Sequence, residues 1–302
     1  IVWFRDACHV TRQFRPGDFC LVPPTSGVFM SDEMLDAKYR GLLEQLRSFG
    51  SVAVAFSGGV DSALLLHAAH EALGERAIAI TTQSRLFPQR ELDEAITFCL
   101  ERDIPQVIVP THELEDESFR RNPSDRCYLC KKGLLQAVID AANERCVETV
   151  VEGSNVDDES DYRPGSRAIA ELDVLSPLKD AGLTKSDIRE LSRERGLPTW
   201  DKPLFACLAT RFAFGTCLSA DHLAMIDAAE QFLLDRGFHQ VRVRYHGSTA
   251  RVEVRADEVK RLVLPENREA MERRFKELGF ERVEVDPDGY RTGNMNVASE
   301  GM

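Results

Sequence analysis

The feature that most constrains this chain is a short apolar run that ends in two glycines. Residues 52–56 (Val-Ala-Val-Ala-Phe) are too few for a helix, and Ser57-Gly58-Gly59-Val60-Asp61-Ser62 follows at once. Residues 63–69 then favour a helix. This order predicts a buried strand of a parallel sheet, a tight turn and a helix. Two adjacent glycines also let the backbone approach a ligand closely, without an intervening side chain.

The helix start after this turn predicts an anion site. Free backbone N–H groups point outward there, and the helix dipole favours negative charge. Ser57 and Ser62 add hydroxyl donors, so we expect a phosphate group. A capped Gly-Gly turn without a ligand is the alternative. The full six-residue motif after a strand favours the phosphate loop. No Gly-Lys-Ser/Thr follows, so the motif is not a Walker A loop.

Composition restricts the class of protein. The 302 residues are 43% hydrophobic and 29% charged, as in a soluble globular protein of about two domains. The net charge of -12 argues against a nucleic-acid partner, which needs a basic surface. No apolar run reaches the length of a membrane span, and no signal-peptide pattern begins the chain. We therefore expect a cytoplasmic protein without a membrane partner, whose eight cysteines are thiols or ligands rather than disulfides.

Strand and helix patterns alternate up to about residue 215. The predicted strands are 52–56, 77–82, 106–110 and 148–152, and helices at 88–101 and 132–144 lie between them. This alternation predicts an α/β fold with a doubly wound parallel sheet, covered on both faces. A further helix is predicted at 185–195.

The two ends of the chain differ from this middle part. Residues 1–31 hold scattered prolines and charges without periodicity, so we expect a disordered N-terminal extension without function, followed by an amphipathic helix at 33–49. Beyond Gly215 the patterns predict a smaller α+β domain with helices at 220–236 and 268–278, a hairpin at 240–255 and a strand at 282–285. We divide the chain into 1–31, 32–215 and 216–302.

Ligands of parallel sheets bind at the carboxyl ends of the strands. Three segments should meet there, namely 57–62, 82–84 and 153–155. Ser84, Gly153 and Asn155 are therefore candidate binding residues. A helix or turn cap is an equal alternative for Ser84 and Asn155.

Three cysteines form a candidate reactive group. Cys127 and Cys130 make a C-x-x-C motif, predicted on a loop just before a helix, and Cys207 is the third. The motif alone fits a redox pair, half of a zinc site or coincidence. Three thiolates would leave one iron of a [4Fe–4S] cluster, or one position on zinc, without a protein ligand. A fourth ligand from Cys217 would close such a site.

Residues 57–62 resemble the PP-loop of the N-type ATP pyrophosphatases, which include GMP synthetase, NAD synthetase and the tRNA thiolases. The resemblance implies that ATP is cleaved between its α and β phosphates, that a substrate oxygen is adenylylated and that pyrophosphate leaves. It implies Mg²⁺ at Asp61. The implied ATP-binding residues are Ala55, Phe56, Ser57, Gly58, Gly59, Asp61, Ser62, Ser84, Gly153 and Asn155.

Further stretches resemble the LarE family of ATP-dependent sulfur transferases. They are residues 122–132, 152–158, 161–165, 207–216 and 241–246. The resemblance runs from about Met34 to Asn296 and implies sulfuration of pyridinium-3,5-biscarboxylic acid mononucleotide. That reaction gives the thiocarboxylates of the nickel-pincer cofactor of lactate racemase. The family also implies a homo-oligomer.

The family has two variants. In one, a single cysteine donates its sulfur and becomes dehydroalanine. In the other, three cysteines resemble the set that holds a [4Fe–4S] cluster in some tRNA thiolases. Cys127, Cys130 and Cys207 match the second variant, and Cys207 occupies the sacrificial position if no cluster is bound.

Charged residues of the C-terminal part are candidate substrate contacts. Arg242 and Arg244 lie two apart on a predicted strand and so share a face, and an Arg grips carboxylate or phosphate through two hydrogen bonds. The solvated face of an edge hairpin is the alternative. The resemblance favours substrate or phosphate binding, and it adds Arg211, Tyr162, Arg163, Glu230 and Glu253. For the two glutamates, a surface carboxylate and a strand salt bridge are nearly equal alternatives.

Two other functions are consistent with the motifs. The first is another PP-loop enzyme, either a tRNA thiolase or an amide-forming ligase like GMP or NAD synthetase. The acidic composition opposes the tRNA thiolase, and an amide-forming ligase leaves the three cysteines unexplained. The second is a non-catalytic ATP-binding sensor of redox state.

Overall fold

The computed structural model of the protein describes residues 26–159, 165–203 and 206–291. Its first sheet has four parallel strands in the order β3-β2-β1-β4. The strands are β1 (Val52–Ala55), β2 (Ala77–Gln83), β3 (Gln106–Pro110) and β4 (Val150–Val151). The parallel sheet predicted from the alternating pattern is therefore confirmed, although β4 is shorter than predicted.

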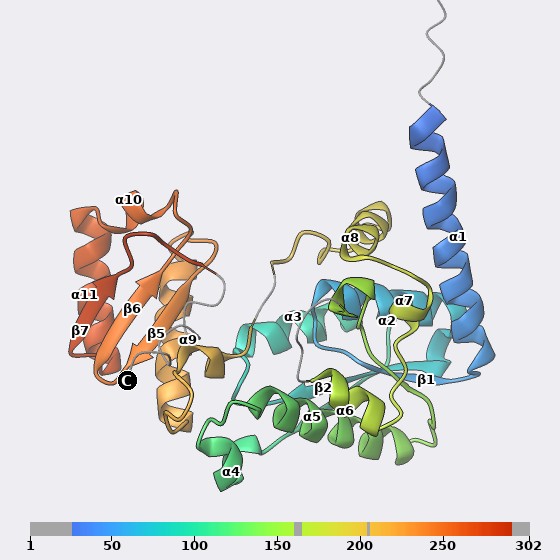
Figure 1. Ribbon diagram of the computed structural model, residues 1–302, viewed down its shortest axis with the longest axis horizontal. Helices are drawn as coiled ribbons and strands as arrows, with labels where there is room; N and C mark the ends of the chain where they lie inside the picture. The colour runs from blue at the N-terminus through green and yellow to red at the C-terminus, as the bar shows by residue number, and fades with distance from the viewer. Residues whose placement is uncertain (1–25, 160–164, 204–205, 292–302) are drawn as a thin grey trace, which may run out of the picture.

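Helices cover both faces of this sheet (Figure 1). On one face lie α1 (Ser26–Ser48), α2 (Val60–Leu73), α3 (Gln89–Leu100), α7 (Pro177–Asp180) and α8 (Lys185–Glu194). On the other lie α5 (Arg126–Asn143) and α6 (Ser166–Glu171). The helix predicted at 33–49 thus starts earlier, at Ser26, within the predicted extension 1–31. Residues 1–25 lie outside the described part.

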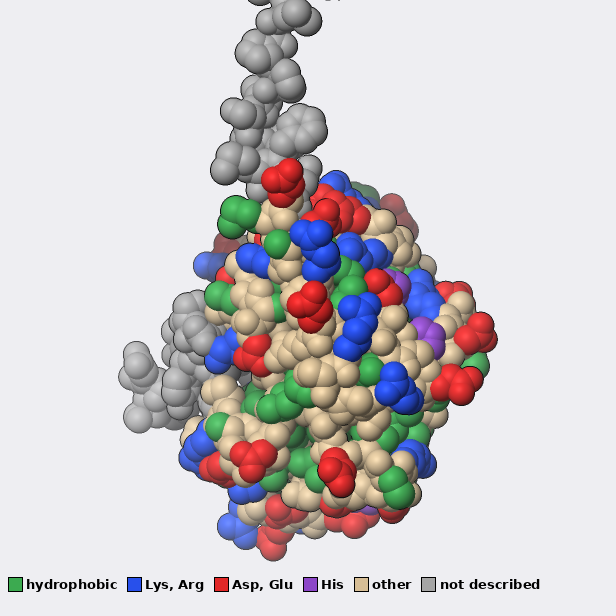
Figure 2. Space-filling view, turned by 90° about the vertical axis from the view of Figure 1, so that its right-hand side faces the viewer, with side chains coloured by type: hydrophobic (Ala, Val, Ile, Leu, Met, Phe, Trp, Pro, Cys, Tyr) green, Lys and Arg blue, Asp and Glu red, His purple; other side chains and the backbone are tan. Residues whose placement is uncertain are grey.

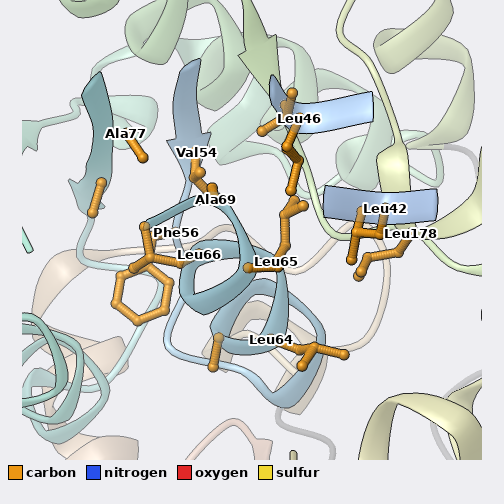
Figure 3. Packing of buried hydrophobic residues seen from close by; sticks show 14 of the residues in the cluster. Leu42, Leu46, Val54, Phe56, Leu64, Leu65, Leu66, Ala69, Ala77 and Leu178 are labelled. Carbon is orange, nitrogen blue, oxygen red and sulfur yellow. The ribbon is translucent and has the colours of Figure 1, made fainter. Parts of the chain in front are cut away.

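The alternation of side chains along β1 explains the two layers. Val52 and Val54 belong to the apolar cluster under α2, whereas Ala53 belongs to the cluster under α5. Successive side chains of a strand point to opposite faces, so an apolar run without polar residues needs a cover on both sides. Figure 3 shows leucines of α1 and α2 packed together with Val54 and Leu178.

The order of the strands creates a binding crevice. The chain proceeds outward from β1 to β2 and β3, then crosses through α5 to β4 on the other side of β1. The direction of winding therefore reverses between β1 and β4. In open α/β sheets, ligands bind outside the carboxyl ends of the strands at this point.

The C-x-x-C motif was predicted on a loop, and this prediction is wrong. Helix α5 begins at Arg126 rather than Lys132, so Cys127 and Cys130 lie within its first two turns. Asn122 explains the earlier start. Its φ of 55° turns the chain, and its buried side chain accepts a 2.5 Å hydrogen bond from Arg126 Nη1. This bond holds the new helix one turn after the bend.

The C-terminal part forms a second, three-stranded sheet in the order β5-β6-β7. The predicted hairpin is present, since β5 (Arg242–His246) pairs antiparallel with β6 (Thr249–Glu253). β7 (Arg282–Val285) pairs parallel with β6. The helices of this part are α9 (Ala220–Leu234), α10 (Val259–Leu262) and α11 (Pro265–Leu278). The smaller α+β unit is thus present, and the proposed domain boundaries remain predictions.

The two sheets belong to units that touch. The apolar cluster of the C-terminal unit also contains Leu86, from the loop after β2, and Phe119, from the short helix α4 (Glu117–Arg120). Gly215 N donates to Asn122 O at 2.9 Å, and Leu218 N donates to Arg120 O at 2.8 Å. None of the helices in the described ranges is long and apolar enough to cross a membrane.

Candidate active site

A cavity of about 470 Å³ opens at the carboxyl ends of the parallel strands. All three predicted segments line it, and their lining residues include Ser57, Gly59, Asp61, Ser62, Thr82, Gln83, Ser84, Gly153 and Ser154. Ala55 and Phe56 line it as well. Its volume lies within the range of small-molecule sites. The structure therefore brings together most of the residues that we assigned to ATP.

Contacts of Gly58, Ser57 and Ser62 fix the conformation of the phosphate loop. Gly58 has a φ of 73°, and a Cβ there would lie 3.3 Å from Ala95 Cβ. Ser62 Oγ lies 3.1 Å from Ser57 Oγ and accepts a hydrogen bond from Ser57 N at 3.3 Å. Gly59 caps α2 without a side-chain hydrogen bond. The first N–H groups of α2 can therefore donate to an anion.

Gly153 joins β4 to this loop. A Cβ on Gly153 would lie 2.9 Å from Ser62 N and 3.2 Å from Asp61 C, closer than real Cβ atoms approach a backbone nitrogen. Only a residue without a side chain fits here. The contact packs the segment after β4 directly against the phosphate loop.

Ser84 and Asn155 have the capping roles considered as alternatives, and each also contacts the site. Ser84 Oγ accepts from Leu86 N at 3.1 Å and lines the cavity. Asn155 Oδ1 accepts from Asp157 N at 3.0 Å, while its Nδ2 donates to Asp61 Oδ1 at 3.3 Å. Asn155 is buried and is not among the residues that line the cavity.

Asp61 supplies the carboxylate to which we assigned Mg²⁺, and that assignment remains a prediction. Its carboxylate lines the cavity and is ion-paired with Lys185. Mg²⁺ usually binds proteins through one or two carboxylates together with substrate phosphates. A single carboxylate beside a phosphate site fits that donor set.

Sequence reasoning missed three lysines that line the cavity. Lys131 pairs with Glu152 at 3.1 Å, Lys185 with Asp61, and Lys202 with Glu91 and Glu94 at 2.8 and 2.6 Å. Lys131 directly follows Cys130, and Lys185 directly follows Thr184, the N-cap of α8. For these two lysines, the position beside a residue already considered was the sequence signal that could have pointed to the cavity.

Glu152 pairs with Lys131 and also accepts hydrogen bonds from Ser154 and Ser176. Burial opposes its ionisation, but Lys131 and the hydrogen bonds from Ser154 and Ser176 keep its pKa below the usual value. The carboxylate is therefore charged at neutral pH, and Lys131 remains beside the cavity.

The three candidate cysteines come from two elements. Cys127 and Cys130 lie on α5, and Cys207 lies just before the short helix η4 (Leu208–Arg211). Burial raises the pKa of the Cys130 thiol, and Cys207 and Cys127 raise it further. Burial likewise raises the pKa of Cys207, against the opposing effect of Arg126. Cys130 and Cys207 also pack against the same apolar cluster.

The three thiols are ligands of the kind that an iron–sulfur cluster or zinc requires. Cys127 and Cys130 are three residues apart on one helix, so they share a face, and Cys207 comes from outside that helix. In the part of the chain that is described, no three His, Cys, Asp or Glu side chains are gathered closely enough for a metal ion. The thiols would have to converge on binding. Cys217, the considered fourth ligand, is exposed.

Four of the charged residues that we considered as substrate contacts form two buried ion pairs. Arg211 and Glu230 form two hydrogen bonds of 2.8 and 2.9 Å and are both buried. Arg244 and Glu253 are also buried and lie 2.8 Å apart. The salt-bridge alternative for Glu253 is therefore observed, and Glu230 is buried rather than on the surface.

Arg242 is buried as well, and its guanidinium lies 5.3 Å from the centre of the Tyr290 ring. None of the five paired or buried charges lines the cavity. Their substrate-binding role remains a prediction. Arg211 nevertheless contacts the backbone of Cys207, because its Nη1 donates to the Cys207 carbonyl oxygen at 3.1 Å. Tyr162 and Arg163 lie outside the described residues.

Comparisons with known proteins bear on this arrangement. Models of protein families give no match to the chain. The chain is 35% identical to the pyridinium-3,5-bisthiocarboxylic acid mononucleotide synthase of Lactiplantibacillus plantarum, over 87% of this chain and 95% of that protein.

The chain belongs to the LarE family. It is therefore an enzyme, as predicted. An uncharacterised Synechocystis protein is another relative, with 34% identity over 87% of this chain and 98% of its own length. The argininosuccinate synthase of Natronomonas pharaonis is 28% identical over 49% of this chain and 39% of its own length. That partial match agrees with the PP-loop fold of this LarE-family enzyme and with the use of ATP.

Proposed function

We propose that this LarE-family enzyme adenylylates a carboxylate of pyridinium-3,5-biscarboxylic acid mononucleotide and replaces the activated oxygen by sulfur. The main support is the cavity that brings the phosphate loop, Gly153 and three lysines together at the carboxyl ends of the strands. The synthase of Lactiplantibacillus plantarum, which carries the bisthiocarboxylic acid mononucleotide in its name, supports the choice of substrate.

The first step activates the carboxylate. A carboxylate oxygen attacks the α-phosphorus of ATP, the bond to the bridging oxygen breaks, and pyrophosphate leaves. The N–H groups of the first turn of α2 and the hydroxyls of Ser57 and Ser62 would bind the phosphates. Lys185 and Mg²⁺ at Asp61 would offset the charge on the leaving pyrophosphate.

The second step forms the thiocarboxylate. A sulfur nucleophile attacks the acyl carbon, and AMP leaves with the original carboxylate oxygen. Cys207 is the proposed sulfur-bearing position, with Cys127 and Cys130 beside it. Arg211 would hold the Cys207 carbonyl during this step, as it does in the structure.

Two sources of sulfur follow from the three thiols. With a [4Fe–4S] cluster held by Cys127, Cys130 and Cys207, the open iron would carry the transferable sulfur. Without it, Cys207 would donate its own sulfur. Its Cα would lose a proton, its Cβ–S bond would break, and dehydroalanine would remain.

Product analysis tests the proposed reaction. The full chain is incubated anaerobically with Mg-ATP and the biscarboxylic acid mononucleotide, and AMP, pyrophosphate and the product mass are measured. We expect AMP and pyrophosphate in equal amounts and a product with sulfur in place of oxygen. Cys207→Ser should abolish sulfur insertion, whereas Cys146→Ser, at an exposed cysteine outside the site, should not. Substrate-independent ATP cleavage without a sulfurated product would contradict the proposal.

Iron and mass measurements separate the two sulfur sources. About four iron atoms per chain after anaerobic purification, lost in Cys127→Ala, Cys130→Ala and Cys207→Ala, would support the cluster. No iron in any preparation, together with loss of H₂S from Cys207 after turnover, would support the sacrificial route. The homo-oligomer and the cytoplasmic location remain predictions.

A further inference from the structure

A second cavity lies beside the first, and both units of the protein line it. Its volume is about 520 Å³, within the range of small-molecule sites. From the first unit, Gln83 and Pro110, the last residues of β2 and β3, line it. From the C-terminal unit, Leu223 and Asp227 of α9 line it. The cavity therefore lies between the two units, at the carboxyl ends of the parallel strands.

The two cavities share part of their lining. Four residues line both, namely Gln83, Ser84, Phe87 and Gln89. A molecule in the second cavity would thus lie next to a nucleotide in the first. The proposed reaction needs ATP and its acceptor side by side, because a carboxylate oxygen has to reach the α-phosphorus. Two adjoining cavities meet this requirement.

The second cavity also adjoins the segment that carries Cys207. Leu208, the residue after Cys207, lines the cavity, and its N–H donates to the carbonyl oxygen of Leu86 at 2.8 Å. Arg85 directly precedes Leu86 and lines the cavity as well. Arg85 and Cys207 are therefore each next in sequence to one partner of the same hydrogen bond.

The charged side chains at the second cavity favour an anion. Arg85 is exposed, and among the residues that the structure describes it has neither a hydrogen-bond nor an ion-pair partner. Asp227 is the one carboxylate among the described lining residues, and it pairs with Arg90 at 2.8 Å. The guanidinium of Arg85 can therefore bind a carboxylate or phosphate through two hydrogen bonds.

Two helices that begin at the second cavity add to this preference. Gln89 and Ala220, both in its lining, are the first residues of α3 and α9. The N-terminus of a helix carries partial positive charge, which attracts anions. His112 lines the cavity too, and its Nδ1 lies 3.4 Å from Glu115.

We propose that the second cavity binds the acceptor of the reaction, a pyridinium mononucleotide, and that Arg85 binds its phosphate. The carboxylate to be activated is on the pyridinium ring and has to face ATP in the first cavity. The phosphate is at the ribose end of the acceptor and would extend to Arg85. The proposal rests on the proposed function, which supplies the acceptor. The predicted substrate contacts Arg211, Arg242 and Arg244 line neither cavity.

Calorimetric titration with two probes tests this assignment. Nicotinic acid mononucleotide carries a pyridinium carboxylate and a phosphate, and nicotinic acid riboside lacks the phosphate. Each is titrated into the full chain, which is first saturated with Mg²⁺ and α,β-methylene-ATP. We expect the mononucleotide to bind about tenfold or more tightly than the riboside, because hydrogen bonds between charged groups are strong.

Exchanges of Arg85 should remove this difference between the probes. In Arg85→Met the mononucleotide should bind as weakly as the riboside, while the riboside and the ATP analogue keep their wild-type affinities. Arg85→Lys should restore part of the difference, because the positive charge is kept.

Two further variants separate the role of Arg85 from general effects. Arg76→Met is the matched control, because Arg76 is also exposed but lies just before β2 and lines neither cavity. It should bind all three ligands as the wild type does. Ala224→Trp tests the cavity itself, since Ala224 is exposed and lines it from α9. The larger side chain should weaken binding of both probes and leave the ATP analogue unaffected.

Three results would overturn the proposal. They are wild-type affinity for the mononucleotide in Arg85→Met, failure of the mononucleotide to bind while the ATP analogue is bound, and loss of ATP-analogue binding in Arg85→Met. The second result would place the acceptor in the first cavity, and the third would make Arg85 an ATP contact. Failure of sulfur insertion in the product assay would refute the proposed function and leave these binding results intact.

Discussion

At the scale of single residues, the site depends on a glycine that lets two backbones meet. Gly153→Ala would place a Cβ 2.9 Å from Ser62 N, so the phosphate loop would have to shift. We expect the affinity for an ATP analogue to fall by about tenfold or more and stability to fall by about 1–3 kcal/mol. Calorimetric titration and thermal unfolding measure the two effects.

Gly133→Ala is the matched control. Gly133 lies within α5, and a Cβ there would meet nothing within 4 Å. The exchange should stabilise the protein by about 0.5–1 kcal/mol and leave nucleotide affinity unchanged. Wild-type affinity in Gly153→Ala would show that the loop tolerates the shift.

The thiols allow a second prediction at this scale. The thiolate is the reactive form, and burial raises the pKa of Cys130 and of Cys207. In the metal-free protein at neutral pH, iodoacetamide should therefore modify exposed Cys146 faster than either of them. Cys99 should be the slowest, because it is buried in the apolar core where the reagent cannot reach it, whereas Cys130 and Cys207 are partly exposed.

The pH dependence of the Cys130 alkylation rate follows from the same raised pKa. Because the folded pKa lies above the ordinary 9.0, the Cys130 rate should still rise with pH beyond that value. Peptide-resolved mass spectrometry gives each rate. A Cys130 rate that levels off below 9.0 would contradict the placement of this thiol.

At the scale of elements, the Arg211–Glu230 pair joins η4 to α9 inside the C-terminal core. Burial opposes the charge of Glu230, but Arg211 holds its pKa below the ordinary 4.5. Glu230→Gln removes the carboxylate that is paired with the buried guanidinium of Arg211. Removing one partner of a buried pair costs about 3–5 kcal/mol. Urea unfolding at neutral pH should show a loss of this size.

The stabilising effect of Glu230 should decrease at low pH. A carboxyl with a lowered folded pKa stabilises the protein above its unfolded-state pKa, and this contribution is lost as pH falls through the folded value. The difference between wild type and Glu230→Gln should therefore shrink below about pH 4.5. Glu269→Gln, at an exposed position of α11, should stay within about 0.5 kcal/mol of the wild type at both pH values. An equally small effect in Glu230→Gln would mean that the pair is not formed.

At the scale of the whole molecule, the distribution of charge distinguishes a mononucleotide from a tRNA as the sulfur acceptor. The chain has 50 acidic and 38 basic residues. On the face that carries α1, acidic and basic side chains are interspersed (Figure 2). Nucleic-acid affinity depends on clustered basic residues that displace counterions.

We therefore expect no gel shift with bulk tRNA at physiological salt. Non-specific binding by basic proteins has dissociation constants of roughly 10⁻⁴ to 10⁻⁶ M, and this chain should bind more weakly. A tRNA-binding protein in parallel lanes serves as the positive control. A salt-sensitive shift at submicromolar protein would favour the tRNA thiolase alternative.

Local patterns in the sequence were sufficient for the scaffold and the phosphate loop. The run 52–62 predicts strand, turn and helix because all three depend on neighbouring residues, and the alternation of such units predicts a parallel sheet. The start of α5 was missed, because it depends on the turn at Asn122 and on its hydrogen bond to Arg126.

Only the tertiary structure decided which charges surround the cavity and which pair elsewhere. Lys185 meets Asp61 across 124 residues, and Lys202 meets Gly58 across 144. Arg244 and Glu253 lie on the two paired strands of one hairpin and are buried together. Periodicity records which side of an element is apolar. It does not record which distant element supplies the partner of a charge, because that depends on how the layers pack.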